Sequence, residues 1–472
     1  MTTPLFDNSY ARLPERFYTR MQAEPVSHPK LLKLNTALAE AMGLDAEWLS
    51  AEDGLAMLAG NGLPKGADPL AQVYAGHQFG GWSPRLGDGR ALLLGEVTGP
   101  DSAHWDIQLK GSGPTPYSRS GDGRAWLGPV LREYIVSEAM AALGVPTTRA
   151  LAAVTTGDTV LREQRYPGAI LTRVASSHVR VGTFQYFASQ QDKDGLRALL
   201  NFSIQRHYPD LEENDALGFL KAVVQAQASL VAKWMGLGFI HGVMNTDNCH
   251  IGGLTIDYGP CAFMDAYHPS KVFSSIDQFG RYAYGAQPEI LVWNLAQLAT
   301  SLLPLIHNDM DHAVETAQDA LHSFGLLYTD AWKTVFFAKI GLSKGADPEI
   351  ALVQDLLTRM ADNQADFTRT FRGLSDGTAR EEFVDPTAFD AWSDGWLPHN
   401  PDRDLMNTTN PAFIPRNHQI EQVISEALSG DFNRFERLVS ILATPFTNQP
   451  EHAEFQVAPR EQELVSQTFC GT

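Results

Sequence analysis

Cysteine is scarce in this chain of 472 residues. Only Cys249, Cys261 and Cys470 are present. Small domains held together by disulfide bonds carry a far higher density of cysteine, so a disulfide framework is not expected. No two of the three form a C-x-x-C pair, and a zinc site is therefore not expected either.

Long apolar runs are also missing. No window approaches the roughly 18 uninterrupted apolar residues that indicate a transmembrane helix. The N-terminal segment "MTTPLFDNSYARLPERFYTR" lacks the apolar core of a secretory signal. These two observations predict a cytoplasmic protein that does not bind membranes.

Acidic residues outnumber basic residues in this chain. The chain has 36 Lys and Arg against 55 Asp and Glu, which gives a net charge of -19. Such a surface repels the phosphates of nucleic acids, so no nucleic-acid partner is expected. A local basic pocket for a small phosphate ligand remains compatible with this balance.

The apolar and turn residues predict an α+β protein. Strand-like runs occur over 90–110 and 150–175, and a helix is predicted between them over 129–143. Pro129 suits the first turn of that helix and Gly144 suits its C-terminal cap. The order of elements thus begins with strands and one inserted helix.

The second half is mostly helical. A long helix is predicted over 215–237, leading to His241, and a pair of short strands over 249–257. Near the N-terminus, residues 28–44 are predicted as one amphipathic helix.

This order of elements is typical of a two-lobed, protein-kinase-like fold. It would comprise an N-terminal extension (1–70), a strand-rich lobe (71–190) and a helical lobe with a C-terminal extension (191–472). The order alone gives weak support, because many α+β proteins share parts of it.

The segment "HGVMNTDN" (His241–Asn248) matches only part of the kinase catalytic loop H-R-D-L-x-x-x-N. The position of the catalytic base holds Val243, which cannot accept a proton. Asp247 in the same loop is the candidate proton acceptor, because a base needs hydrogen-bond reach of the nucleophile rather than a fixed position. Alternatively, Asp247 caps a turn or binds the metal directly.

Four kinase landmarks occur in the expected order. Lys110 ends a strand, Glu133 lies in the following helix, Asn248 lies in the loop, and Asp257 opens "DYG". Lysine neutralises phosphate oxygens and glutamate holds the lysine, while Asn and Asp offer hard oxygen ligands to Mg²⁺. Each residue alone has a common structural explanation, but the four together predict a site for ATP and a metal ion.

Two glycine-rich loops add capacity to bind phosphate. "LGDGR" (86–90) lies where a turn covering the nucleotide is expected, although a plain Asp-Gly hairpin fits the letters equally well. The loop 111–128 carries Arg119 and Arg124, and its glycines would let the backbone approach an anion. A surface loop without a ligand is the alternative.

Arg173 and Arg180 are seven residues apart. Two turns of helix would place them on one face, where they could clamp a phosphate. A pair of surface salt bridges is the commoner outcome for such arginines.

Six stretches between residue 6 and about residue 418 resemble the selenoprotein O family of pseudokinase-fold protein adenylyltransferases. They are "FDNSYARLPERFY", "YAGHQFGGWSPRLGDGRALLLGE", "DIQLKGSGPTPYSRSGDGRA", "HGVMNTDN", "LTIDYGP" and "NPAFIPRNH". The resemblance implies a kinase-like fold that binds ATP turned around relative to ordinary kinases. It implies transfer of AMP to Ser, Thr or Tyr hydroxyls of proteins, the chain itself included, with release of pyrophosphate.

The resemblance also implies residue roles. Asp247 would accept the proton, Asn248 and Asp257 would bind Mg²⁺ or Mn²⁺, and Glu133 would pair with Lys110. The implied ATP-binding residues are Gly87, Gly89, Arg90, Lys110, Asp122, Gly123, Arg173, Arg180 and Asp257.

The chain departs from the family pattern at its cysteines. The tail reads "FCGT", so Cys470 is kept without the usual serines, and Phe273 occupies a segment where many bacterial relatives have cysteine. A redox switch between these two positions is therefore not expected. Cys249 and Cys261 are alternative partners for the tail, or simply small buried hydrophobic residues.

Two other functions remain open. One is an orthodox kinase that transfers the γ-phosphate of ATP. The other is a scaffold that binds ATP without catalysis, in which Val243 marks lost chemistry.

Overall fold

The computed structural model describes residues 3–343 and 348–469. It is an α+β protein, as the sequence predicted, with one large sheet built from the first part of the chain and helices in the second. The strand order of the sheet is β1 (Tyr18–Arg20), β3 (Leu70–Gln72), β6 (Ala91–Thr98), β7 (His104–Lys110), β10 (Arg165–Ala175), β9 (Arg149–Leu161) and β2 (Lys30–Leu34), and β8 (Ala125–Trp126) also pairs with β10. The paired strands are antiparallel.

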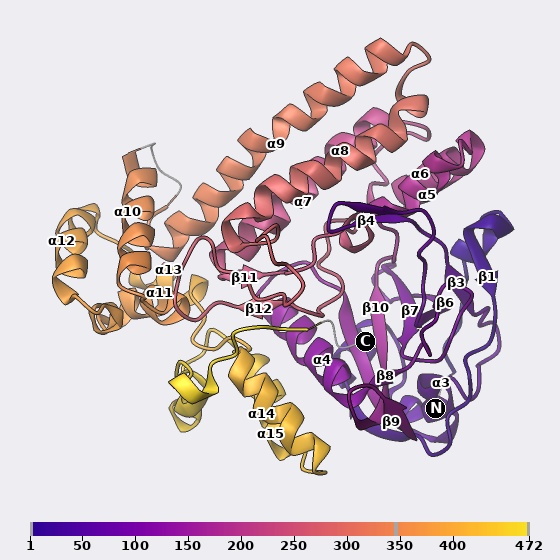
Figure 1. Ribbon diagram of the computed structural model, residues 1–472, viewed down its shortest axis with the longest axis horizontal. Coiled ribbons are helices and arrows are strands. Elements are labelled where there is room, and N and C mark those ends of the chain that lie inside the picture. Colours follow the sequence, from indigo (N-terminus) through magenta and orange to yellow (C-terminus); the bar gives the residue numbers. More distant parts are fainter. Residues whose placement is uncertain (1–2, 344–347, 470–472) are drawn as a thin grey trace.

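Two short strand pairs lie outside this sheet: β4 (Gly76–Gln78) with β5 (Gly81–Ser83), and β11 (Phe239–Ile240) with β12 (Ala262–Phe263). The α-helices are α1 (Thr36–Ala41), α2 (Ala46–Ser50), α3 (Glu52–Ala59), α4 (Leu127–Ala142), α5 (Val181–Ser189), α6 (Lys193–His207), α7 (Ala216–Gly236), α8 (Gln287–Ile306), α9 (Met310–Lys339), α10 (Pro348–Asp362), α11 (Phe367–Asp376), α12 (Pro386–Trp396), α13 (Arg403–Thr409), α14 (Asn417–Leu428) and α15 (Asn433–Leu442). In Figure 1 the sheet lies to one side, α7, α8 and α9 run together above it, and α10 to α13 form the far end.

The centre of the sheet is buried because helices cover it. Helices α3 and α4 both contact β9 and β10. Strand β6, "ALLLGEVT", is buried over every residue but the last, as expected of a strand that is packed on both sides. Charged side chains that point inward from these strands therefore sit in a low-dielectric interior.

Two predicted helices are confirmed. The helix predicted over 129–143 is α4, and Gly144 follows it with a φ of 76°, a left-handed conformation that favours glycine. The helix predicted over 215–237 is α7. Its side-chain cap, Asp215, accepts a hydrogen bond from the backbone of Gly218.

Two other local predictions are wrong. Residues 28–44 do not form one helix, because β2 pairs with β9 and the helix α1 begins only after Asn35, whose side chain caps it. The strand pair predicted over 249–257 does not form either. His250 and Thr255 instead make isolated bridges with Arg180 and Thr147, so both segments find partners far away in the sequence.

One described segment, Tyr284–Ile306, is long and apolar enough to cross a membrane by length and composition. It contains α8, which contacts α5, α7 and α9. Its fully buried Asn294 donates a hydrogen bond to the carbonyl of Met244 at 3.1 Å. These contacts are those of a helix that belongs to the protein core.

Candidate active site

Lys110, the last residue of β7, lies in a buried ionic cluster. Its ammonium group donates to Glu133 Oε2 at 2.5 Å and to Asp257 Oδ1 at 2.8 Å. The side chains of Lys110 and Glu133 are only 10% and 7% exposed. The sheet supplies the lysine and α4 supplies the glutamate, so packing of that helix against the sheet fixes their separation.

Arg173 and Arg180 both reach Asp257, but not from one helical face. Arg173 lies in β10, and Arg180 precedes α5 with an extended backbone. The prediction that two turns of helix align them is wrong, because the chain leaves the sheet and turns before the helix begins. Arg173 Nη1 donates to Asp257 Oδ1 at 2.8 Å, and Arg180 Nη1 lies 3.6 Å from Asp257 Oδ2.

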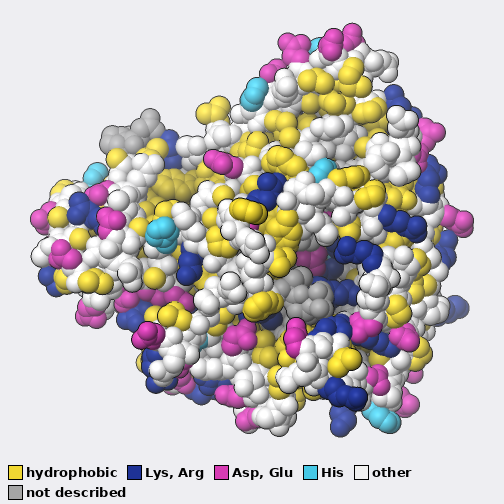
Figure 2. Space-filling view, in the orientation of Figure 1, with side chains coloured by type: hydrophobic (Ala, Val, Ile, Leu, Met, Phe, Trp, Pro, Cys, Tyr) yellow, Lys and Arg dark blue, Asp and Glu magenta, His cyan; other side chains and the backbone are white. Residues whose placement is uncertain are grey.

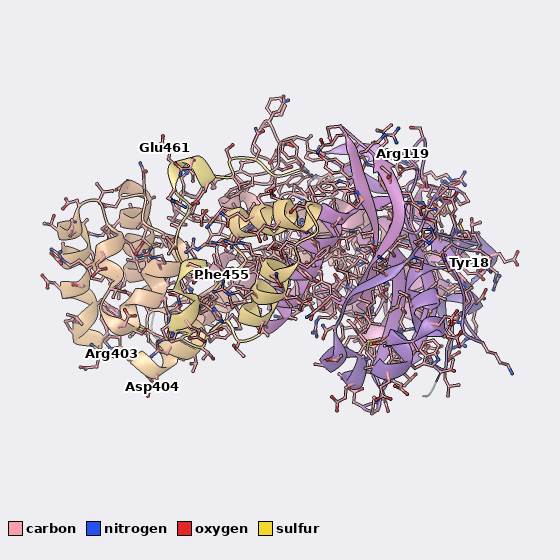
Figure 3. All side chains as sticks on the ribbon, turned by 90° about the horizontal axis from the view of Figure 1, so that it is seen from below. Tyr18, Arg119, Arg403, Asp404, Phe455 and Glu461 are labelled. Atoms are coloured by element: carbon pink, nitrogen blue, oxygen red, sulfur yellow. The ribbon has the colours of Figure 1, made fainter. Side chains whose placement is uncertain are left out.

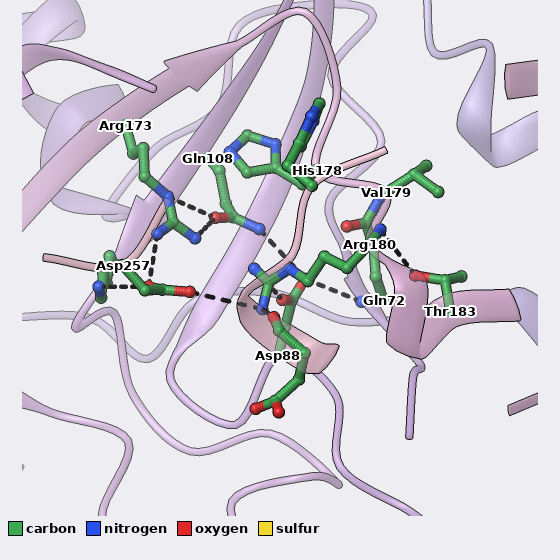
Figure 4. A network of polar contacts seen from close by, with 12 residues as sticks. Gln72, Asp88, Gln108, Arg173, His178, Val179, Arg180, Thr183 and Asp257 are labelled. Carbon is green, nitrogen blue, oxygen red and sulfur yellow. Dashed lines mark hydrogen bonds and ion pairs between the residues drawn. The ribbon is translucent and has the colours of Figure 1, made fainter. Parts of the chain in front are cut away.

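Asp257 is therefore surrounded by cations (Figure 4). Burial alone would raise its pKa, but the charges of Lys110, Arg173 and Arg180 outweigh burial and hold the pKa well below the ordinary value. The backbone of Asp257 has a φ of 65°, which is uncommon for a residue with a side chain. The surrounding contacts hold an ionised carboxylate in a conformation that the backbone alone does not favour.

Asp247 lies in a short 3-10 helix, Thr246–Asn248, of the predicted catalytic loop. Gln78 Nε2 donates to its Oδ2 at 3.0 Å, whereas its buried Oδ1 has no hydrogen-bond partner in the described part of the chain. Burial raises the pKa of Asp247 to about 6, against the opposing effects of Gln78 and Arg180. A buried carboxylate with one oxygen free of hydrogen bonds and a pKa near neutrality suits a proton acceptor.

Arg180 connects this loop to Asp257. Its Nη1 donates to the backbone carbonyl of Asp247 at 3.1 Å, in addition to its contact with Asp257. The candidate proton acceptor and the candidate metal ligand are thus joined through one buried guanidinium.

The hairpin of β4 and β5 contacts the predicted catalytic loop. The backbone amide of His77 donates to Thr246 Oγ1 at 2.7 Å, and that of Phe79 donates to Asn245 Oδ1 at 3.1 Å. A Cβ atom on Gly76 would lie 2.7 Å from Asp247 Oδ1, so only glycine leaves room for this carboxylate. The hairpin therefore helps to set the position of Asp247.

Asn248 is oriented by the residue that occupies the usual base position. Its Nδ2 donates to the carbonyl of Val243 at 2.9 Å, which leaves the amide oxygen available to a cation. Within residues 3–343 and 348–469, no group of three or more His, Cys, Asp or Glu side chains could hold a metal ion. Mg²⁺ is commonly held by one or two protein oxygens plus substrate phosphates, and Asn248 with Asp257 fits that donor set.

The turn 86–90 is tightly packed. Its backbone pairs with residues 72–74, since Leu86 and Asp88 donate to the carbonyls of Tyr74 and Gln72. Gly87 has a φ of 114°, and a Cβ there would lie 2.5 Å from the ring of Tyr117. Local packing therefore accounts for this glycine independently of any ligand.

Asp122 is not in contact with the Lys110 cluster. It is exposed and accepts two hydrogen bonds from Arg162, at 2.8 and 2.9 Å, which keep its pKa below the ordinary value. Its neighbour Gly123 has a φ of 64°, and a Cβ there would overlap the carbonyl of Gly113. Arg124 pairs with Glu24 at 2.8 Å.

Arg119 is exposed and lies toward the sheet end of the molecule (Figure 3). Figure 2 shows Lys and Arg side chains gathered on the sheet side of a central hollow. The loop 111–128 therefore places Arg119 at the surface, whereas Arg124 of the same loop pairs with Glu24 in the N-terminal segment.

A cavity of about 610 Å³ opens beside the Lys110–Glu133 pair. Arg90, just before β6, and Lys110 of β7 line one side of it, and Glu421 of α14 and residues of the C-terminal segment 465–469 line another. A volume of this size is sufficient for a nucleotide. Asp247, Asn248 and Asp257 do not line the cavity, so Lys110 and Glu133 are the residues that connect it to the cluster around Asp257.

The sequence predicted no role for several polar residues around the candidate site. Gln78 contacts Asp247, Gln108 contacts Arg173, and Asp88 faces Arg180. Gln108 could have been singled out from the sequence, because it lies two residues before Lys110 and therefore on the same face of β7. No sequence signal marked Asp88 as buried, because Asp in "LGDGR" reads as an exposed turn residue.

Cys249 and Cys261 are both buried, and burial raises the pKa of the Cys249 thiol to about 12. Such a thiol is unreactive, which favours the interpretation as small hydrophobic residues. Cys470 lies outside the described residues. Phe273 is buried, and its carbonyl accepts a hydrogen bond from the backbone of Thr468 at 2.7 Å.

Comparison with known proteins shows the family of the chain. Residues 2–443 match the model of a family described as protein adenylyltransferase SelO. Protein nucleotidyltransferase YdiU of Ruegeria sp. (strain TM1040) is 59% identical over 475 residues, and that of Jannaschia sp. (strain CCS1) is 58% identical over 479 residues. Each alignment covers 99% of both chains.

These matches define the class as a nucleotidyltransferase enzyme that acts on proteins. The chain belongs to the SelO family. The family and the enzyme class predicted from the sequence are thereby confirmed.

Proposed function

We propose that this protein transfers AMP from ATP to the hydroxyl of Ser, Thr or Tyr in other proteins and in its own chain, with release of pyrophosphate. The hydroxyl oxygen forms a bond to the α-phosphorus, and the bond from that phosphorus to the bridging oxygen of the β-phosphate breaks. Asp247 takes the hydroxyl proton. Pyrophosphate carries away the electron pair of the broken bond.

The proposed fold is kinase-like, with an N-terminal extension (1–70), a strand-rich lobe (71–190) and a helical lobe with a C-terminal extension (191–472). The proposed pose turns ATP around relative to ordinary kinases, so that its α-phosphate meets Asp247. The family description supports this orientation, since adenylyl transfer requires attack at the α-phosphorus.

The buried cations would stabilise the phosphates. Lys110, Arg173 and Arg180 lie around Asp257, and Arg90 lines the adjoining cavity. Fixed positive charge in a site without bulk water stabilises the charge that develops on phosphate oxygens during transfer. The further ATP residues of the proposal are Gly87, Gly89, Asp122, Gly123 and Asp257.

Asn248 and Asp257 would hold Mg²⁺ or Mn²⁺. When bound, the ion supplies charge neutralisation at the phosphates. Glu133 acts indirectly, because it holds the ammonium group of Lys110.

The observation that carries the proposal is the buried carboxylate of Asp247, whose Oδ1 has no hydrogen-bond partner among the described residues and whose backbone is linked through Arg180 to Asp257. Intact-protein mass spectrometry tests it after incubation of the protein and candidate substrates with ATP and metal. We expect a mass increase that corresponds to an adenylyl group. An increase that corresponds only to a phosphoryl group would refute the proposal.

ATP labelled separately at the α and γ positions distinguishes AMP transfer from an orthodox kinase. We expect protein to retain the α label and lose the γ label; the reverse pattern identifies a kinase.

Asp247→Ala distinguishes the enzyme from a non-catalytic scaffold. We expect labelling to fall by about 10²-fold or more, the usual contribution of a general base, while ATP binding is kept. Unchanged labelling would show that Asp247 is not the proton acceptor.

A further inference from the structure

We propose that Asp88 is a positioning residue of the ATP site, whose carboxylate balances the charge of Arg180 and so leaves Asp257 available to the metal ion. The inference rests on the proposed function, because it assumes that Asp257 binds the metal. It assigns a role to a residue that lies between the predicted nucleotide-binding residues Gly87 and Gly89.

Asp88 points into the protein rather than into solvent. The residue is only 2% exposed. Its Oδ2 accepts hydrogen bonds from the backbone amide of Gln72 at 3.1 Å and from Gln108 Nε2 at 3.2 Å. Burial raises the pKa of Asp88 to about 6, and the charge of Arg180 opposes this rise. A carboxylate in such a place is costly unless a cation compensates it.

The compensating cation is Arg180. Asp88 Oδ1 has no hydrogen-bond partner in the described chain, and it lies 4.0 Å from Arg180 Nη2 (Figure 4). On its other side Arg180 Nη1 lies 3.6 Å from Asp257 Oδ2. The guanidinium also stacks over the ring of Tyr74 at 4.5 Å, which fixes its plane. Arg180 is therefore held between two carboxylates.

A second connection runs through Gln108. Its Nε2 donates to Asp88, while its Oε1 accepts from Arg173 Nη2 at 2.6 Å. Arg173 in turn donates to Asp257. Asp88 thus fixes which way the amide of Gln108 points, and so influences the second arginine that holds Asp257.

The consequence is a competition for Arg180. With Asp88 charged, the guanidinium shares its attraction between Asp88 and Asp257. Without that charge, Arg180 would be drawn more strongly toward the side of Asp257 and the Asp247 carbonyl, and would compete more strongly with a metal ion for the Asp257 carboxylate. The charge on Asp88 should therefore raise the affinity of Asp257 for metal, although Asp88 itself is buried and does not line the cavity beside Lys110.

Asp88→Asn tests this inference, since it removes the charge and keeps the size of the side chain. Equilibrium binding of ATP is measured calorimetrically over a range of Mg²⁺ concentrations, and AMP transfer is measured over the same range. We expect the half-saturating Mg²⁺ concentration to rise about tenfold, which is only part of the interaction between two charges at this distance, because Asp88 acts on Asp257 through Arg180. At saturating Mg²⁺, kcat should return to within about threefold of the wild-type value.

Asp106→Asn is the matched control. Asp106 is equally buried, and burial also raises its pKa to about 6, but its cation is Arg206 at 3.4 Å, outside the site. We expect Asp106→Asn to leave the half-saturating Mg²⁺ concentration unchanged, even if it lowers the melting temperature.

Two results would overturn the inference. One is an unchanged half-saturating Mg²⁺ concentration in folded Asp88→Asn protein, and the other is an equal shift in both variants. The binding measurement needs no catalysis. A wild-type protein that binds Mg²⁺ and ATP but transfers no AMP would therefore refute the proposed function and leave this test of Asp88 valid.

Discussion

Asp247 of the predicted catalytic loop and Asp257, which lies beyond that loop, have opposite electrostatic surroundings. Burial raises the pKa of Asp247 to about 6, whereas three cations hold the pKa of Asp257 well below its ordinary value. A carboxylate that titrates near neutrality can accept a proton, and one that stays ionised can hold a cation. Surroundings rather than residue type thus favour different roles for the two aspartates.

Val243, another single residue of the predicted catalytic loop, has a structural role. Its side chain is buried, and its carbonyl accepts hydrogen bonds from Asn245 and Asn248. These contacts use the backbone and leave the side chain free to be apolar. The loop geometry therefore does not require a carboxylate at position 243.

Gly76→Ala should impair catalysis without unfolding the protein. The new Cβ would lie 2.7 Å from Asp247 Oδ1 and force this carboxylate to move. A displacement of about 1 Å can cost about 10²-fold in rate, and we expect AMP transfer to fall by about 10- to 100-fold. Labelling of protein by ATP carrying the α label measures the effect.

Gly81→Ala is the control in the same hairpin. A Cβ there would meet only the carbonyl of Gln78 at 3.4 Å, an ordinary contact. An equal loss of activity in both variants would show that any substitution in the hairpin lowers activity. The loss would then not be specific to the space beside Asp247.

At the scale of elements, Arg206 joins helix α6 to the sheet. Its guanidinium pairs with Glu96 of β6 and with Asp106 of β7, and it donates to the carbonyl of Ser176 at 2.8 Å. Arg206→Met leaves two buried carboxylates without their cation, and we expect it to lower the free energy of unfolding by about 3–5 kcal/mol. Urea denaturation measures this change.

Arg197→Met on the same helix gives the comparison. Arg197 is exposed and pairs with Asp194 at 3.7 Å. Exposed pairs contribute about 0–1 kcal/mol, so its free energy of unfolding should barely change. Equal effects of the two substitutions would argue against the buried network as the link between α6 and the sheet.

Lys339 at the end of α9 should make stability depend on pH. Its buried ammonium donates to Asn410 Oδ1 at 2.9 Å, and burial lowers its pKa from 10.5 to about 7. Between these values the unfolded chain binds a proton that the folded chain does not, so the free energy of unfolding rises with pH. The total rise should be at most about 5 kcal/mol, and below about pH 7 this contribution should be constant.

Urea denaturation at several values between pH 7 and pH 10 measures this slope. Lys339→Met should remove the part of the slope that belongs to this residue, and Lys221→Met, at an exposed position on α7, should leave it unchanged. A slope that persists in Lys339→Met would assign the dependence to other groups.

At the scale of the whole molecule, the C-terminal helices complete the core beside the sheet. Helices α14 and α15 both contact α4, and Phe435 of α15 lies 5.7 Å from Tyr134 of α4, centroid to centroid. A chain that ends after Gln449 keeps these contacts, and one that ends after Arg416 exposes the buried Tyr134. We expect cooperative thermal unfolding for the longer chain only, measured by circular dichroism.

Local patterns were sufficient to predict α4 and α7, because periodic apolar residues, caps and terminal glycines act within a few residues. They failed over 28–44, where the alternative to helix is pairing with β9 more than a hundred residues away. The same limit applies to 249–257. Strand pairing depends on partners that a local pattern does not contain.

The candidate site was likewise predictable only in part. Lys110, Glu133 and Asp257 were predicted from their order, and the structure brings them into contact. The network through Arg180 and Asp88 was not predictable, because it depends on which buried polar groups meet across several elements.

The crowding of Asp257 by three cations has a consequence for the order of ligand binding. A free divalent ion meets a carboxylate whose charge is already satisfied, whereas phosphate oxygens offer Lys110 and the arginines other partners. Metal should thus enter as a complex with nucleotide rather than ahead of it. Titration with Mn²⁺ alone should release little heat, and prior addition of ATP should restore a strong signal.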